Sequence, residues 1–172
     1  MGQKSATIRP AEVTDLPSIE AVARAAWSVA YAGIIPDGVQ RRLLDRWYSS
    51  VALTRALGAQ ESTFLVAECE GSVVGFAQYL RRSAESVELT RIYVRPDRQH
   101  SGIGTKLLEA GVAAFAQQGV RRLTVLVERD NTVGRHFYAR TGFTEVRELS
   151  REAEGFLLKL VECNRSIQGC NL

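Results

Sequence analysis

The chain has 172 residues, of which 45% are hydrophobic and 24% are charged, and its formal net charge at pH 7 is +3. This length suits one globular domain with a real core, since domains usually have about 100–200 residues. The small basic excess excludes the dense Lys/Arg clusters of a dedicated nucleic-acid-binding protein, so we expect no nucleic-acid partner.

The first sixty residues predict one strand and two helices. The segment 6–10 reads as a short opening strand. Apolar residues recur at helical spacing over 14–31, and again over 39–57 after a turn that contains Pro36 and Gly38. Both helices are amphipathic, so each is expected to pack one face on a sheet.

Strands dominate the remaining sequence. Residues 62–82 predict a hairpin with a tight turn at 70–72, and residues 86–96 predict a strand that Pro96 ends. The elements expected after it are a helix at 104–119, a strand at 120–128, a short helix at 131–142, and strands at 143–149 and 155–162.

These elements predict an α/β (α+β mixed) fold in one domain. A mixed, mostly antiparallel sheet of about seven strands is expected to be flanked by about four helices. Residues 163–172 show no periodicity. We therefore place the domain at 1–162 and expect a loose C-terminal tail from 163.

The N-terminal sequence and the number and spacing of the cysteines predict a cytoplasmic protein with no membrane partner. The N-terminal MGQKSATIRP lacks the apolar core of a signal peptide, and no stretch approaches the roughly 18 apolar residues of a membrane span. Cys69, Cys163 and Cys170 are odd in number and lack C-x-x-C spacing. A disulfide framework is therefore not expected.

Two glycines, Gly102 and Gly104, lie where the helix at 104–119 begins. The first turn of a helix leaves N–H groups without partners, and a backbone without Cβ atoms lets a bulky anion approach them, which favours a phosphate cradle. A tight strand-to-helix turn would need the same glycines, so that alternative stays open. The order Gly104-Thr105-Lys106 excludes a Walker loop. A dinucleotide fingerprint fits poorly because Leu107 occupies its third glycine position.

The spacing Gln99-x-x-Gly102-x-Gly104 resembles the Q/R-x-x-G-x-G/A acyl-CoA loop of the GCN5-related N-acetyltransferase (GNAT) superfamily. Three further stretches resemble that family in the right order: IRPAEVTDLPSIEAVARAAW as its opening, LTRIYV as its central strand and NTVGRHFYARTGF as its later helix. The resemblance spans residues 7 to about 160. The stretch ELTRIYVRPDRQHSGIGTKLL is most similar to PaiA-type polyamine acetyltransferases.

The resemblance implies the acyl-CoA N-acyltransferase fold, with acetyl-CoA as co-substrate and no metal. It further implies direct transfer of the acetyl group to a primary amine, a polyamine or another small amine, in a ternary complex. In the family the strand matching LTRIYV splays from the next strand, which frees its backbone for the pantetheine amides. The implied cofactor-binding residues are Ile92, Tyr93, Val94, Gln99, His100, Ser101, Gly102, Ile103, Gly104, Thr105, Asn131 and Tyr138.

The resemblance also implies the catalytic residues. Tyr138 matches the general acid that protonates the leaving thiolate, and Phe137 beside it is expected to be the core residue of the pair. Glu88 lies eleven residues before Gln99, where histone-acetylating relatives carry their catalytic glutamate, so it is the expected general base. Protein N-terminal acetylases of the superfamily carry a glutamate at the position of Leu126. Its absence here weakens the hypothesis that the chain acetylates a ribosomal protein.

The acceptor and its partners are less constrained by the sequence. Trp27, Tyr31, Trp47 and Tyr48 would either line an acceptor pocket or form core. A non-catalytic acyl-CoA-binding sensor remains the alternative function, and a homodimer remains an option because sister domains pair. His100 and His136 have no Cys or Asp at meaningful spacing, so neither a hydrolase triad nor a metal centre is expected.

Overall fold

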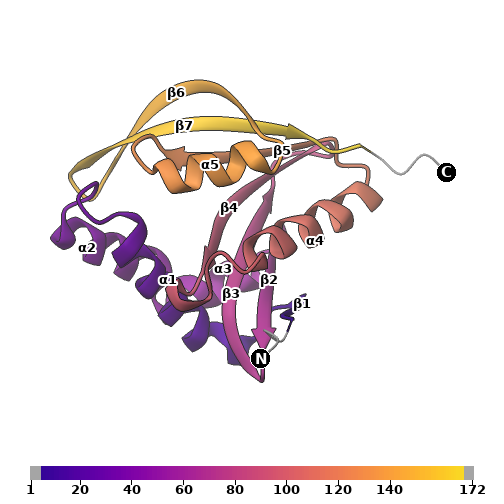
Figure 1. Ribbon diagram of the computed structural model, residues 1–172, viewed down its shortest axis with the longest axis horizontal. Coiled ribbons are helices and arrows are strands. Elements are labelled where there is room, and N and C mark those ends of the chain that lie inside the picture. The colour runs from indigo at the N-terminus through magenta and orange to yellow at the C-terminus, as the bar shows by residue number, and fades with distance from the viewer. Residues whose placement is uncertain (1–4, 169–172) are drawn as a thin grey trace.

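The computed structural model describes residues 5–168, which form one seven-stranded sheet with helices on both faces (Figure 1). The strands are β1 (Thr7–Pro10), β2 (Ser62–Cys69), β3 (Ser72–Arg81), β4 (Ser86–Val94), β5 (Arg122–Glu128), β6 (Thr144–Ala153) and β7 (Phe156–Ser166). The helices are α1 (Leu16–Ala30), α2 (Asp37–Tyr48), α3 (Ser50–Gly58), α4 (Ile103–Gln117) and α5 (Thr132–Arg140), with short 3-10 turns at Val13–Asp15 and Pro96–Arg98.

The strand order is β1-β2-β3-β4-β5-β7-β6, and only β4 and β5 run parallel. The other neighbours pair antiparallel, which confirms the mixed, mostly antiparallel sheet expected from the sequence. In Figure 1, α4 and α5 lie in front of the sheet. Their core cluster contains Leu107, Leu108 and Tyr138, whereas α1, α2 and α3 pack a second cluster on the opposite face.

Turn chemistry explains the hairpin between β2 and β3. Glu70 and Gly71 have φ angles of +52° and +76°, the left-handed conformations that a two-residue hairpin turn requires. Strand β2 alternates so that Phe64 and Val66 are buried. The hairpin expected at 70–72 is therefore confirmed.

The helix expected over 39–57 is two helices, which raises the expected four to five within the described chain. Ser49 has an extended backbone (φ −61°, ψ 154°) that ends α2, and its Oγ accepts a hydrogen bond of 3.3 Å from the Ala52 N–H at the start of α3. A serine N-cap offers this bond to a new helix, and the apolar periodicity alone did not reveal it.

The loose tail expected from residue 163 is wrong for residues 163–167. Strand β7 runs to Ser166 and pairs with β5 from Leu160 to Ser166, and Cys163 and Ile167 are buried. The polar residues between these two buried positions hide the strand pattern, yet β7 lies between β5 and β6, so its backbone groups are paired on both sides. The boundary expected at 162 thus falls inside a strand, and 169–172 lie outside the described residues.

The sheet divides between β4 and β5. These strands pair only where Ser86–Leu89 meets Arg122–Val125. Beyond that point β4 is paired to β3 alone and β5 to β7 alone, and Thr90 forms a bulge that has no partner in β3. Figure 1 shows the two halves of the sheet diverging: β2, β3 and β4 extend toward the bottom of the view, and β5, β6 and β7 cross its top. No helix within 5–168 is long and apolar enough to cross a membrane.

Candidate active site

The gap between β4 and β5 leaves one edge of Thr90–Val94 without strand partners. A peptide-like chain can add to such an edge by backbone hydrogen bonds. Ile92 and Val94 direct their half-buried side chains toward the cluster under α4, and Tyr93 packs into the cluster on the other face. These side chains can therefore pack in the core while the backbone edge of the same residues stays free to pair with a ligand.

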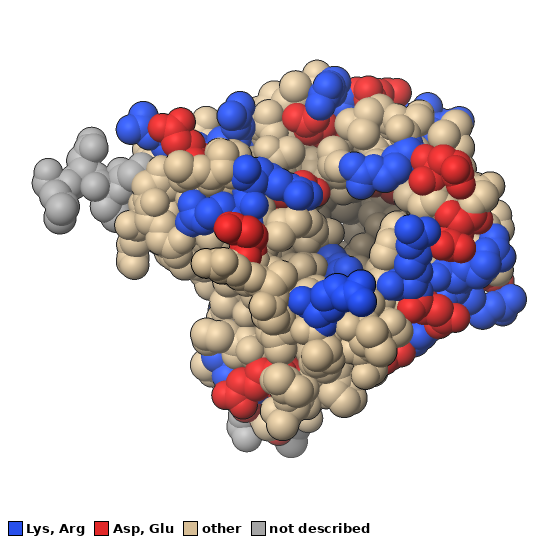
Figure 2. All heavy atoms as spheres, turned by 180° about the vertical axis from the view of Figure 1, so that it is seen from behind, with Lys and Arg blue, Asp and Glu red and all other residues tan. Residues whose placement is uncertain are grey.

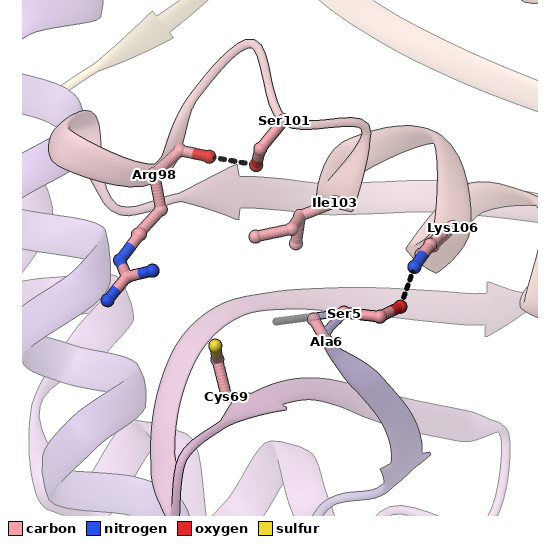
Figure 3. A pocket seen from close by; sticks show the side chains of 7 residues that line it. All are labelled: Ser5, Ala6, Cys69, Arg98, Ser101, Ile103 and Lys106. Carbon is pink, nitrogen blue, oxygen red and sulfur yellow. Dashed lines mark hydrogen bonds between the residues drawn. The ribbon is translucent and has the colours of Figure 1, made fainter. Parts of the chain in front are cut away.

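The loop between β4 and α4 is held in shape by its own polar groups. Gln99 Nε2 donates to the Val94 carbonyl at 3.2 Å, and Ser101 Oγ donates to the Arg98 carbonyl (Figure 3). His100 has a φ of +60° and Gly102 a φ of +79°. Gly102 is the N-cap of α4 and no side chain caps this helix, so its first-turn N–H groups face outward without a side-chain acceptor.

The two glycines of the loop serve different purposes. Gly102 needs its freedom because its φ is positive, and a Cβ there would meet nothing within 4 Å. Gly104 has no positive φ, and a Cβ there would lie 3.4 Å from Phe137 Cε2 and 3.9 Å from Val94 Cγ2. A turn therefore accounts for Gly102, whereas Gly104 keeps open the space between α4, α5 and the end of β4.

Basic side chains near the loop are partly engaged by other groups. Arg95 Nε lies 2.6 Å from Asp97 Oδ1, and Lys106 Nζ donates to Ser5 Oγ. Figure 3 shows Lys106 turned toward the start of β1, across a hollow of about 230 Å³ behind the loop. Arg98 lines the same hollow, and His100 is exposed.

Helix α5 follows β5 directly and carries Asn131 at its N-cap and Tyr138 in its last turn. Asn131 caps the helix, since its Oδ1 accepts a 3.0 Å hydrogen bond from the Gly134 N–H. Tyr138 is 8% exposed, and its ring centroid lies 5.3 Å from those of Phe137 and Phe143. Phe137 is only half-buried, so the expectation that it is the core residue of the pair is wrong. The helix turns Tyr138 inward onto the sheet.

The hydroxyl of Tyr138 has a chemically useful environment. Burial raises the pKa of Tyr138 above that of a free tyrosine, so the phenol keeps its proton at neutral pH. No hydrogen bond to this hydroxyl exists within residues 5–168, and the atom is not among their buried unpartnered ones. Within the described residues, no other group therefore uses the Tyr138 proton.

An aromatic cluster lies on the opposite face of β4. Trp27 and Tyr48 are buried core residues, whereas Tyr31 and Trp47 are half-buried. The Tyr31 and Tyr93 hydroxyls lie 3.2 Å apart, and burial raises the pKa of both phenols. Of the four aromatics expected to form core or line a pocket, two are core and two remain partly open.

Glu88 lies away from the gap, in the closed part of β4. It is paired in register with Thr124 of β5 and faces the side of the sheet opposite α5. Its Oε2 accepts a 2.7 Å hydrogen bond from Arg82 Nε, and its side chain is 19% exposed. Glu88 lines a hollow of about 240 Å³ with Arg82, Thr124, Glu162 and Asn164. The structure thus does not place the expected base beside Tyr138.

The sequence marks Glu128 only as the acid that the poorly fitting dinucleotide fingerprint would need at the end of the following strand, and not as a residue of an acetyl-CoA or acceptor site. It is the last residue of β5 and 6% exposed, and its side chain shares a face with Leu126 because strand residues alternate. Leu126 and Tyr31 both pack on the cluster under α1, α2 and α3, so Glu128 lies on the same face of the sheet as Tyr31. A single acid that ends an otherwise apolar strand was the available signal.

Two other acids are engaged in ion pairs, and no metal cluster is formed by the described residues. Asp15 is paired with Arg9 and Glu20 with Arg24, so these carboxylates are occupied. Within 5–168, no group of three or more His, Cys, Asp or Glu side chains is placed to hold a metal ion. Cys69 and Cys163 are buried and form no disulfide.

Figure 2 shows the face behind Figure 1, where the surface is deeply hollowed. Lys and Arg side chains gather around the hollow, with Asp and Glu side chains among them. Two arginines of α2 reach the turn between β6 and β7: Arg46 Nη1 lies 2.8 Å from Glu154 Oε1, and Arg42 Nη2 donates to the Glu154 carbonyl at 3.2 Å. These contacts join α2 to the β6–β7 hairpin on this side of the sheet.

Comparisons with known proteins agree with this geometry. The model of the Acetyltransferase (GNAT) family matches residues 22–143. A spermidine N(1)-acetyltransferase of Thermoplasma acidophilum is 31% identical over 143 residues, which cover 81% of this chain and 88% of the relative. A mycothiol acetyltransferase of Tsukamurella paurometabola is 27% identical over 139 residues, 79% of this chain and 46% of that protein.

Solved structures share the fold. The PaiA N-acetyltransferase of Thermoplasma acidophilum, crystallised with coenzyme A, superposes with a TM-score of 0.84 at 25% identity and covers 95% of this chain and 99% of its own. The ribosomal-protein-S18-alanine N-acetyltransferase of Escherichia coli has a TM-score of 0.74 at 22% identity, covering 97% and 98%. The second likeness concerns the fold alone.

Proposed function

Because the chain belongs to the GNAT family of acetyltransferases, and is thus an acetyl-CoA-dependent N-acetyltransferase, we propose that it acetylates a small primary amine by direct attack in a ternary complex. A polyamine is the proposed acceptor class, since a relative that covers most of the chain is named for acetylating spermidine. The non-catalytic sensor is not favoured.

One observation supports the proposal: the free edge of β4, the uncapped start of α4 and helix α5 meet, since a Cβ on Gly104 would lie 3.4 Å from Phe137 and 3.9 Å from Val94. Tyr138 is the residue after Phe137 on α5. The pantetheine amides would pair with the backbone of Ile92–Val94 like an added strand. The pyrophosphate would accept hydrogen bonds from backbone N–H groups of the segment Gln99–Thr105. Ile103 would contribute only its backbone, because its side chain is 7% exposed and packs in the core.

Asn131 keeps an unused donor although it caps α5. Its Oδ1 accepts the Gly134 N–H, and its Nδ2 group forms no hydrogen bond within the described residues. In the proposed CoA contact, this Nδ2 group would donate to an acceptor atom of the ligand.

The transfer itself needs one base and one acid. The ammonium first gives one proton to the base. The neutral nitrogen then forms a bond to the acetyl carbon while the C–S bond breaks, and the thiolate takes the Tyr138 proton. The second proton that the nitrogen loses on becoming an amide is released to solvent, from which the phenol is reprotonated. Glu88 is retained as the proposed base. It would act through water, because Arg82 holds its carboxylate in the closed part of β4.

A calorimetric titration with CoA, acetyl-CoA and NADH tests the co-substrate, and a panel of primary amines that includes spermidine tests the reaction. We expect CoA and acetyl-CoA to bind, NADH not to bind, and at least one amine to be acetylated. Acetyl-CoA binding without turnover of any amine would support the sensor instead. Binding of NADH alone would refute both readings.

Gly104→Val is expected to weaken CoA binding about tenfold or more while the domain stays folded. The added methyl groups would press against Phe137 and Val94, since even a Cβ lies 3.4 Å from the Phe137 ring. Calorimetry measures the Kd. Gly58→Val is the matched control, because a Cβ on Gly58 meets nothing within 4 Å. Equal Kd values for the two variants would contradict the proposed cradle.

A further inference from the structure

Four polar or charged side chains are buried within the described chain, and two of them, Asp15 and Glu128, are carboxylates, of which only Asp15 has a cationic partner. Asp15 accepts two hydrogen bonds from Arg9, at 2.8 and 3.0 Å. Gln40 donates to the carbonyls of Ile35 and Tyr31, and Gln78 donates to Ser62 Oγ. Glu128 receives only the Asp130 N–H, on its Oε2 at 2.6 Å.

A buried carboxylate without a cation is unfavourable, because the protein must replace the water it has lost. Glu128 forms no ion pair with any residue in 5–168. Its Oε1 is not among the fully buried unpartnered atoms of these residues, so it can be reached from outside. The fold therefore holds an open acceptor atom with a negative charge at this position.

The position of Glu128 matches the side from which an acceptor would approach. Glu128 ends β5 three residues beyond Val125, the last β5 residue paired with β4, so it lies in the opened part of the sheet. Val127 faces the core under α4 and α5, so by strand alternation Glu128 faces the other side, where Leu126 and Tyr31 pack beside α1. The co-substrate edge and Glu128 are thus on two sides of one gap.

We propose that Glu128 binds the ammonium group of the acceptor amine and so selects cationic amines. This inference rests on the proposed function, and it assigns the acceptor subsite that the sequence left open. The half-buried hydroxyls of Tyr31 and Tyr93 lie on the same side and offer further acceptor oxygens.

The two charged residues of β4 on this face are already engaged. Glu88 is paired with Arg82. Arg91 donates to the Trp47 carbonyl at 3.0 Å and lies 4.5 Å from the centre of the Tyr48 ring. Its unpartnered Nη1 is fully buried, so no ligand reaches it without rearrangement. Glu128 differs from both, because it is a carboxylate without a cationic partner in the described chain.

The first test measures binding to the folded wild-type protein, with and without saturating CoA. The probes are spermidine, n-butylamine and the uncharged 1-butanol, and the shift in the Tm of the protein is measured with each of them. We expect the two amines, but not the alcohol, to stabilise the protein. Equal shifts for butylamine and butanol, or no shift by either amine, would overturn the inference.

The second test compares Glu128→Gln with Glu109→Gln, a matched loss of one carboxylate on the distant helix α4, where Glu109 pairs with Arg165. Glu128→Gln should weaken the apparent amine affinity about 10- to 100-fold, the range for a lost charged hydrogen bond, and leave the CoA Kd unchanged. Glu128→Asp should recover part of the loss. Unchanged amine affinity in Glu128→Gln would refute the assignment.

The two proposals fail in different ways. If the wild-type protein does not bind CoA, the proposed function is refuted, whether or not an amine binds. Normal CoA binding and amine acetylation with an indifferent Glu128→Gln would refute only the acceptor subsite. If Glu128→Gln lowers the Tm too far for kinetics, the wild-type comparison of butylamine with butanol still decides.

Discussion

Replacing Tyr138 by Phe is expected to lower kcat for amine acetylation by about 10²- to 10⁴-fold, the range for losing a positioned proton donor. The ring would keep its contacts with Phe137 and Phe143, so the variant should fold. Burial already raises the pKa of Tyr138, and the phenol stays protonated at neutral pH and below. Steady-state kinetics with saturating acetyl-CoA measure the effect.

Tyr79→Phe is the matched control, since it also removes one buried phenol. The Tyr79 hydroxyl donates to the Leu107 carbonyl at 3.0 Å, so this variant should lose about 1 kcal/mol of stability and keep its kcat. The CoA Kd should be unchanged in both variants. If Tyr138→Phe retains wild-type kcat, another group protonates the thiolate and the role proposed for Tyr138 is wrong.

Local patterns predicted the elements of this fold well. The 70–72 turn, the strand at 86–96 and the glycine-marked start of α4 depend on residues within a few positions of each other. The break at Ser49 was missed because a cap hydrogen bond can interrupt an unbroken apolar period. The end of β7 was missed because its pairing with β5 lies far away in sequence.

The candidate site was predictable where it is made of backbone. The spacing from Gln99 to Gly104 fixes a loop whose N–H groups start a helix, and the structure has that loop. The acid side chains were harder, because their role depends on which partner the fold supplies. Glu88 is paired with Arg82, whereas Glu128 has no cationic partner in the described chain. The sequence around each residue does not distinguish the two.

Position in the sheet, rather than residue type, separates these two glutamates. Both occupy alternate positions on the same face, one on β4 and one on β5. Pairing of β4 with β5 ends at Leu89 and Val125, so Glu88 lies before the opening and Glu128 after it. A sequence that specifies strands does not specify where a parallel pair separates.

Gly111→Ala is expected to destabilise the domain by about 1–3 kcal/mol or more, the range for overpacking a core. A Cβ on Gly111 would lie 2.7 Å from Tyr79 Cε2 and closer still to Cζ and Oη. The ring of Tyr79 is completely buried and tied to the Leu107 carbonyl, so it cannot swing away. Either α4 must move off the sheet or the ring must leave its hydrogen bond.

The sign of this effect is informative because helix propensity opposes it. Glycine to alanine inside a helix normally gains about 1 kcal/mol, as expected for the control Gly58→Ala, where a Cβ meets nothing within 4 Å. Urea unfolding of both variants measures the difference. Adding Tyr79→Leu to Gly111→Ala should cost less than the sum of the single changes, since the smaller side chain makes room for the methyl group. Additive losses would mean that the ring and Gly111 do not determine how close α4 lies to β3, and that the start of α4 is held at the gap by other contacts.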